Sequence, residues 1–191
     1  MINIIIFGAP GSGKGTQSEK IIEKYKLTHI STGDILRREI SSGTELGKMA
    51  KDYINRGALV PDDLIIEMLE KELIQIGGNS KGVIFDGFPR TVEQAASLKK
   101  MLDKRGERIA LMLNLEVERE ELISRLLKRG ETSGRSDDNL ETIEQRLKVY
   151  ESITSPVIDF YIEEGCHQNL KTVGTIEAIF SDIEKIIDGV I

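Results

Sequence analysis

The sequence predicts an α/β protein in which a parallel β-sheet is covered by helices on both faces. Short apolar runs alternate along the chain with longer amphipathic stretches, which is typical of strands joined by crossover helices. The apolar runs are continuous, as expected for strands that are buried on both faces. With 191 residues, 39% of them hydrophobic, the chain is long enough to form one domain with a substantial core.

The elements follow from these two patterns. The apolar and β-branched runs are predicted strands, at Asn3–Phe7, Thr28–Ile30, Gly82–Phe85, Ile109–Leu115 and Asn169–Val173. The amphipathic stretches are predicted helices, at Gln17–Tyr25, Pro61–Ile76, Val92–Arg105, Glu118–Lys128, Asn139–Glu164 and Ile176–Asp188. Pro156 should bend or break the helix that contains it. Residues 31–60 and 128–138 do not follow the alternation, and we expect them to be excursions that can move relative to the sheet.

The segment after the first predicted strand is a glycine-rich loop, Gly8–Gly13, which leads into Lys14 and a helix. Glycines let several backbone N–H groups converge on one anion, and the helix N-terminus and the lysine add positive charge. Strand, loop, lysine and helix in this order predict a polyphosphate site. The usual pattern has a hydroxyl residue directly after the lysine, but here Gly15 stands there and Thr16 follows. We therefore expect Mg²⁺ to be held mainly by phosphates and water.

A second cluster begins where the predicted strand Gly82–Phe85 ends. Asp86 lies at the carboxyl end of this strand, where ligands bind in open parallel sheets, and can organise Mg²⁺ through water. Its alternative role is to cap a turn. Arg90 follows Phe88 and Pro89, which suits a guanidinium that is fixed for bidentate phosphate binding; the alternative is an ordinary surface arginine.

A third cluster lies at the start of the first excursion. Ser31, Thr32 and Asp34 are candidate N-caps for a helix that begins at Ile35. Capping does not explain Arg37, which follows one turn later.

A fourth cluster is rich in arginine. Arg125 and Arg129 are four residues apart and so lie on one side of the predicted helix, for which Gly130 is a candidate C-cap. Cations at a helix C-terminus can also be simple partners of the helix dipole. Asp138 and Glu141 have the spacing of a capping box, which we expect in preference to direct catalysis by these acids.

The cations come from separate segments, yet each lies near a predicted sheet edge or a mobile loop: Lys14, Arg37, Arg90, Arg125, Arg129, Arg135 and Arg146. Phosphoryl transfer depends mainly on positioning and charge stabilisation, which requires several cations around the transferred group. An acceptor that is itself a phosphate needs no general base, and the sequence contains no convincing Ser/His/Asp or Cys/His set.

Composition narrows the function classes. The net charge of −6 has the wrong sign for general nucleic-acid binding. No apolar run approaches the length of a membrane span, so we expect no membrane association. Cys166 is the only cysteine, which excludes an internal disulfide and a cysteine-rich zinc site. We expect a cytoplasmic protein. Nothing in the sequence suggests an interface, so we also expect a monomer.

Together these motifs resemble those of the nucleoside monophosphate kinases, and most closely the adenylate kinase family of the short-lid type. The matching segments are Gly8–Thr16, Ser31–Arg37, Gly57–Pro61, Asp86–Arg90 with Gln94, Arg129–Asp138 and Arg146. The similarity extends from Met1 to the helix near Phe180. It implies the three-layer αβα fold of P-loop NTPases with a five-stranded parallel sheet. It also implies one kinase domain with the core 1–30, 61–127 and 139–191, an NMP-binding excursion at 31–60 and a short lid at 128–138.

The resemblance further implies the reaction ATP + AMP ⇌ 2 ADP with Mg²⁺ and a role in adenine nucleotide homeostasis. Implied to bind ATP are Gly11, Ser12, Gly13, Lys14, Gly15, Thr16, Arg125, Arg129 and Gly174. Implied to bind AMP are Thr32, Arg37, Ala58, Leu59, Val60, Gly87, Phe88, Pro89, Arg90, Gln94, Arg135 and Arg146. The implied catalytic groups are Lys14, Arg90, Arg129, Arg135, Arg146 and Asp86, the last binding Mg²⁺ through water.

Three alternatives remain open. UMP/CMP kinases resemble this chain closely around residues 130–135, but they tend to have Ala in place of Thr32 and Asn in place of Gln94, which favours AMP here. A non-catalytic nucleotide-binding module would close without transfer, and the complete set of arginines speaks against it. A switch GTPase is weaker still, because the chain has no Asn-Lys-x-Asp segment.

Overall fold

The computed structural model describes residues 1–76 and 80–190 and contains a five-stranded parallel sheet with the order β2-β3-β1-β4-β5. The strands are β1 (Ile2–Phe7), β2 (Thr28–Ser31), β3 (Gly82–Asp86), β4 (Ile109–Glu116) and β5 (His167–Lys171). The predicted α/β class with a five-stranded parallel sheet is therefore confirmed. The predicted core segments 61–127 and 139–191 include residues 77–79 and 191, which lie outside the described part of the chain.

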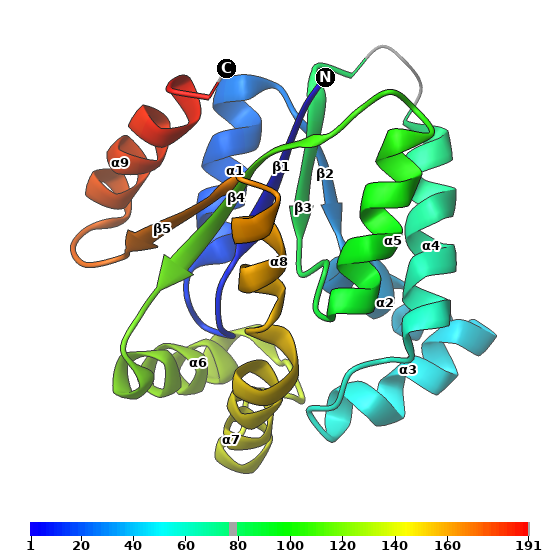
Figure 1. Cartoon of the computed structure of the whole chain (residues 1–191). Coiled ribbons are helices and arrows are strands. Elements are labelled where there is room, and N and C mark those ends of the chain that lie inside the picture. Colours follow the sequence, from blue (N-terminus) through cyan, green and yellow to red (C-terminus); the bar gives the residue numbers. More distant parts are fainter. Residues whose placement is uncertain (77–79, 191) are drawn as a thin grey trace.

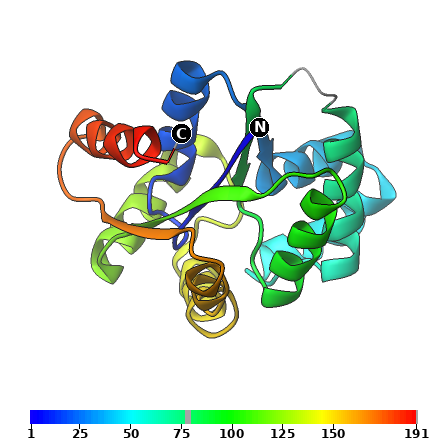
Figure 2. The same ribbon diagram turned by 45° about the horizontal axis from the view of Figure 1, so that its top comes forward.

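Helices form the two outer layers (Figures 1 and 2). One face is covered by α1 (Lys14–Tyr25) and α9 (Ile176–Asp188), and the other by α4 (Asp62–Gln75), α5 (Val92–Asp103) and α8 (Val157–Glu163). Four helices gather beyond the carboxyl ends of the strands: α2 (Thr32–Ser42), α3 (Glu45–Asn55), α6 (Arg119–Ser133) and α7 (Leu140–Val149). The predicted segment 31–60 thus begins with Ser31, the last residue of β2, and continues through α2 and α3 into the connection to α4.

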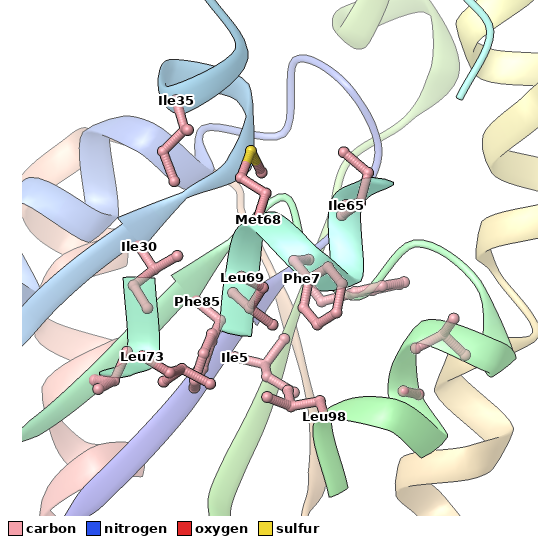
Figure 3. Close-up of a cluster of buried hydrophobic side chains, with 14 of the residues drawn as sticks. Ile5, Phe7, Ile30, Ile35, Ile65, Met68, Leu69, Leu73, Phe85 and Leu98 are labelled. Atoms are coloured by element: carbon pink, nitrogen blue, oxygen red, sulfur yellow. The ribbon is translucent and has the colours of Figure 1, made fainter. Parts of the chain in front are cut away.

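Two hydrophobic cores hold the layers together because successive side chains of a strand face opposite sides. Ile5 and Phe85 point toward α4 and α5, where Leu69 and Leu98 cover them (Figure 3). On the other face Ile4, Ile6 and Ile84 pack against Ile21 of α1 and Ile183 of α9, and all five side chains are at most 1% exposed. Complete burial of such a side chain contributes about 1.5–3 kcal/mol. The central strands are therefore a rigid support for the loops at their carboxyl ends.

The predicted end of the helix Glu118–Lys128 is wrong. Helix α6 continues to Ser133 and ends at Gly134, which adopts a left-handed conformation with φ 63°. Gly130, the predicted C-cap, lies inside the helix. A Cβ atom on Gly130 would come within 2.7 Å of the Asp138 carbonyl oxygen. Gly130 is therefore needed for the close approach of the segment that follows α6, and this reason cannot be recognised from local sequence.

The long helix predicted at Asn139–Glu164 is divided into three pieces. α7 ends at Val149, a π-helical turn, η1, spans Tyr150–Thr154, and α8 begins after Pro156. The predicted break at Pro156 is confirmed, because proline cannot donate the backbone hydrogen bond that a continuous helix needs. The predicted capping box of Asp138 and Glu141 is wrong: Asn139 is the N-cap of α7, and its Oδ1 accepts from the Thr142 backbone N–H at 3.0 Å.

Smaller differences concern the ends of further elements; helix α5, for example, ends at Asp103 and not at Arg105. Strand β5 lies two residues earlier than predicted, because Met112 to Glu116 of β4 pair with His167 to Lys171. Helix α1 begins at Lys14 and not at Gln17. Helix α2 begins at Thr32 and not at Ile35, with Ser31 as its N-cap. In the two helices the polar residues before the apolar stripe form the first turn, where exposed backbone N–H groups are available to caps or ligands.

Candidate active site

The site lies at the carboxyl ends of the parallel strands, where the loops after β1 and β3 meet helices α2, α6 and α7. A cleft of about 550 Å³ opens there, within the ordinary range for a small-molecule site. The structure brings all of the singled-out cations to this cleft: Lys14, Arg37, Arg90, Arg125, Arg129, Arg135 and Arg146. The chain carries a net charge of −6, so the positive charge is concentrated locally by the fold.

The glycine-rich loop wraps around the ammonium group of Lys14. Its Nζ donates to the carbonyl oxygens of Gly8 at 2.7 Å and Ala9 at 2.9 Å, and more weakly to Ser12 Oγ at 3.4 Å. Gly11 and Gly13 adopt φ values of 87° and 93°, which non-glycine residues rarely tolerate. Burial lowers the pKa of Lys14 to about 8; the Asp86 carboxylate acts in the opposite direction, and nearby arginines add to the lowering.

Asp86, the last residue of β3, and Arg90, in the loop that follows, also line the cleft. Asp86 is paired with Ile6 of β1, and its Oδ2 lies 3.8 Å from His29 Nε2. Arg90 is half-buried, and its Nε donates to the Gly87 carbonyl oxygen at 2.8 Å. The same oxygen accepts from Thr32 Oγ1 at 2.8 Å, which ties the start of α2 to this loop. Burial, followed by the nearby Arg146, lowers the pKa of Arg90 to about 10. Arg90 is thus not an ordinary surface arginine.

A second hollow adjoins the cleft between α2, α3 and the β3 loop. It shares Arg37, Gly87, Arg90 and Arg146 with the cleft. It adds five more of the residues singled out for AMP, namely Thr32, Ala58, Leu59, Val60 and Gln94. An anion in the cleft and an uncharged ring in this hollow would therefore be neighbours.

Two acids for which the sequence predicts no arginine partner, Asp137 and Asp138, hold Arg129 of α6 and Arg146 of α7 in place. Asp138 is fully buried and accepts from Arg129 Nε at 2.6 Å and Nη2 at 2.7 Å, and from Arg146 Nη1 at 3.1 Å. Asp137 lies 2.7 Å from Arg146 Nη1. Burial raises the pKa of Asp138, but its hydrogen bonds with Arg129 and the neighbouring guanidinium groups outweigh this effect and hold the pKa below its ordinary value. The fold of residues 128–138 thus positions Arg129 and Arg146 side by side.

Asp62 is a further residue that sequence reasoning missed. Its Oδ1 accepts from Gln94 Nε2 and its Oδ2 from Thr91 Oγ1, both at 2.7 Å. The only local signal is an acid in the first turn of α4, which is also favourable to the helix dipole and is therefore uninformative.

Four singled-out residues line neither the main cleft nor the adjoining hollow: Ser12, Phe88, Pro89 and Gly174. Ser12 is only 1% exposed and lies inside the glycine-rich loop, where its Oγ contacts Lys14. Gly174 lines a separate hollow at the ends of β4 and β5, into which Arg125 also extends. Pro89 and Phe88 line a small hollow beside Gly8 and Lys14. The Phe88 side chain is only 1% exposed and belongs to the hydrophobic core, so its backbone is the part that can meet a ligand.

Comparison with known proteins identifies the family. The family model described as adenylate kinase matches residues 6–166. The chain is 60% identical over 190 residues to an adenylate kinase of Parabacteroides distasonis, covering 100% of both chains. It is 59% identical over 188 residues to an adenylate kinase of Phocaeicola vulgatus, covering 98% of this chain and 99% of the relative. It is 53% identical over 188 residues to one of Porphyromonas gingivalis, covering 98% and 96%. The chain belongs to the adenylate kinase family. It is a nucleoside monophosphate kinase, a phosphotransferase with the P-loop fold.

Members of the adenylate kinase family generally use Mg²⁺ with their nucleotides. Within residues 1–76 and 80–190, no group of three or more His, Cys, Asp or Glu side chains is arranged to hold a metal ion. The carboxylate of Asp86 lines the cleft together with the phosphate loop, and its chemistry fits an ion that takes most of its ligands from phosphate oxygens and water, as Mg²⁺ does. Among the described helices, none combines the length and the apolar character that a membrane crossing requires.

Proposed function

We propose that this kinase transfers the terminal phosphoryl group of ATP to AMP, reversibly, and gives two ADP. The observation that carries the proposal is the convergence of the cations from separate segments on one cleft, directly beside the hollow that contains Gln94. Such a cleft suits two nucleotides that meet through their phosphates, because the negative charge of both would lie among the guanidinium groups. The reaction would maintain the balance of adenine nucleotides.

On the ATP side, the loop residues hold the phosphates and two arginines follow the nucleotide toward its base. The proposed ATP-binding residues are Gly11, Ser12, Gly13, Lys14, Gly15, Thr16, Arg125, Arg129 and Gly174. The loop supports this assignment by its positive-φ glycines and its half-buried lysine, which are features of anion sites. Gly174 would pass its backbone near the base.

On the AMP side, the hollow between α2 and α5 takes the base and the shared cations take the phosphate. The proposed AMP-binding residues are Thr32, Arg37, Ala58, Leu59, Val60, Gly87, Phe88, Pro89, Arg90, Gln94, Arg135 and Arg146. Support comes from the apolar lining of the hollow by Leu59 and Val60 and from the single amide of Gln94. A purine needs both, a flat apolar surface and a few fixed polar groups.

The chemistry follows from the charges. An oxygen of the AMP phosphate attacks the γ-phosphorus of ATP, the bond from that phosphorus to the β–γ bridging oxygen breaks, and the electron pair leaves with ADP. The attacking oxygen is already anionic, so no general base is needed. Lys14, Arg90, Arg129, Arg135 and Arg146 would stabilise the negative charge on the transferred group. Asp86 would hold Mg²⁺ through water, and the ion would supply further charge neutralisation at the phosphates.

The excursions 31–60 and 128–138 are proposed to close over the bound nucleotides around the core 1–30, 61–127 and 139–191. Closure would exclude water, which could otherwise accept the phosphoryl group. We further propose a cytoplasmic monomer whose partners are small nucleotides, with neither nucleic acid nor membrane.

A coupled assay for ADP tests the function. Purified protein with ATP and Mg²⁺ is given AMP, CMP, UMP or GMP in turn, and we expect AMP to be the preferred acceptor. ATP consumption with CMP or UMP but not AMP would instead identify a UMP/CMP kinase. Tight binding of ATP and AMP with negligible turnover would identify a binding module and overturn the proposal.

A further inference from the structure

The Gln94 side chain lines the hollow with an amide whose orientation is determined by its partners. Its Oε1 accepts from the Arg90 backbone N–H at 2.7 Å, and its Nε2 donates to Asp62 Oδ1 at 2.7 Å. A carboxylate can only accept and a backbone N–H can only donate. Exchange of the amide oxygen and nitrogen would set two donors against each other on one side and two acceptors on the other. The chemistry of the two partners therefore permits only one orientation.

Asp62 is itself held in place. Its second oxygen, Oδ2, accepts from Thr91 Oγ1 at 2.7 Å, and the same hydroxyl oxygen accepts from the Gln94 backbone N–H at 3.1 Å as the N-cap of α5. The first turn of α4 and the first turn of α5 are thus joined through one carboxylate. Gln94 is 2% exposed, so any change in its amide orientation would occur in a buried environment where an unpaired polar group is costly.

We propose that Asp62 is a specificity-determining positioning residue, which fixes the Gln94 amide so that the hollow accepts a base with an amino group and rejects one with a carbonyl group. An amide oxygen has two lone pairs and an amide nitrogen has two hydrogens. Asp62 and the Arg90 N–H use one of each, which leaves one acceptor and one donor, in fixed order, for a ligand. This inference rests on the proposed function, in which Gln94 binds the base of AMP.

Adenine matches this remaining pair, because its 6-amino group donates and its adjacent ring nitrogen accepts. Hypoxanthine has nearly the same shape but carries a carbonyl oxygen and a ring N–H at these positions, so both contacts are reversed. Cytosine has the amino pattern of adenine in a smaller ring. The fixed amide therefore distinguishes amino from carbonyl bases, and ring size must be distinguished by the rest of the hollow.

The experiment compares AMP with inosine monophosphate as acceptors at saturating ATP and Mg²⁺. The quantity is the ratio of kcat/KM for the two acceptors, in which losses common to both substrates cancel. D62L removes both carboxylate oxygens, and we expect the ratio to fall about tenfold or more, mainly because kcat/KM for AMP decreases. A site built to hydrogen-bond its substrate rejects an analogue far better than an unspecific site does, and D62L would make the site less specific. The KM for ATP should not change.

Two variants are matched controls. D62N keeps a carbonyl oxygen that can accept from Gln94 Nε2, and we expect it to retain the wild-type ratio within about threefold. D63L removes the exposed neighbouring acid from the same first turn of α4, and it should leave the ratio unchanged. If D62L does not fold in a urea titration, D62S takes its place, because serine is too short to hold the Gln94 amide in the same way.

An unchanged ratio in D62L or D62S would overturn the inference. A ratio in D62N as low as in D62L would overturn it too, because charge and not the accepting oxygen would then be responsible. These outcomes differ from a failure of the proposed function, in which the wild-type protein itself would not form ADP from AMP.

Discussion

Removal of the Asp138 carboxylate should destabilise the protein measurably, because this group is the shared partner of two arginines. Asp138 is fully buried, whereas the Arg129 side chain is 35% exposed and the Arg146 side chain 17% exposed. Loss of one partner of a fully buried ion pair costs about 3–5 kcal/mol, and a surface pair contributes about 0–1 kcal/mol. Because solvent can rehydrate the released arginines in part, we expect D138A to lower the free energy of unfolding by about 2–3 kcal/mol.

Urea titration measures this change, and differential scanning calorimetry should show Tm lower by about 4–12 °C, at about 2–4 °C per kcal/mol for a chain of this size. D182A is the matched control, because it removes an exposed helix pair with Lys185 and should cost at most about 0.5 kcal/mol. The pKa of folded Asp138 lies below its ordinary value, so its contribution is present above that ordinary value and is lost as the pH falls through the folded pKa. A loss in D138A no larger than in D182A, or independent of pH in the acid range, would refute the reasoning.

Three further outcomes follow. In K14M we expect turnover to fall by orders of magnitude. Burial holds the pKa of Lys14 near 8 in the folded protein, below its value in the unfolded chain. The free energy of unfolding of the wild-type protein should therefore rise relative to that of K14M between pH 8 and pH 10, and urea titrations at several pH values measure this change. R135A should lose turnover at nearly unchanged stability, whereas R119A, which removes an exposed pair with Glu151, should keep both; equal rates in the two would contradict the assignment of Arg135. G47A should be destabilised by at least about 2 kcal/mol in urea titration, because its Cβ would lie 2.2 Å from the Glu39 carbonyl oxygen between α3 and α2, and near-wild-type stability would contradict that packing.

Sequence patterns predict the central part of this fold well because a buried parallel sheet has a simple signature. The strands are short, continuously apolar and separated by amphipathic helices, so β1, β3 and β4 were located to within about a residue. The predicted bounds of the edge strand β5 are two residues too late because its residues are mostly exposed and polar, and its register depends on pairing with β4. Local sequence contains no information about such pairing.

The site divides in the same way. The phosphate loop was recognisable because all its parts are consecutive, from Gly8 to Thr16. The roles of Asp62 and Asp138 were not, because each depends on a partner in another element. The spacing of Asp138 to Glu141 predicts a capping box, but the tertiary pairing with Arg129 prevails. Gly130 has the sequence signal of a C-cap, but its importance comes from the approach of the Asp138 backbone, which is a tertiary contact.

The acids of the site explain how so many cations can share one cleft. Arg37 is paired with Asp34 at 2.6 Å, and Arg129 with Asp138, each within one excursion. Arg146 of the adjoining helix α7 is paired with Asp137 of the excursion 128–138. Without these partners, like charges packed at the ends of the strands would destabilise the fold. The partners also keep the planar guanidinium groups in defined positions before any nucleotide arrives. Phosphate oxygens can accept hydrogen bonds from the guanidinium N–H groups that the carboxylates leave free. The repulsion between the gathered positive charges is therefore offset during folding, and no rearrangement of the cations is needed during phosphoryl transfer.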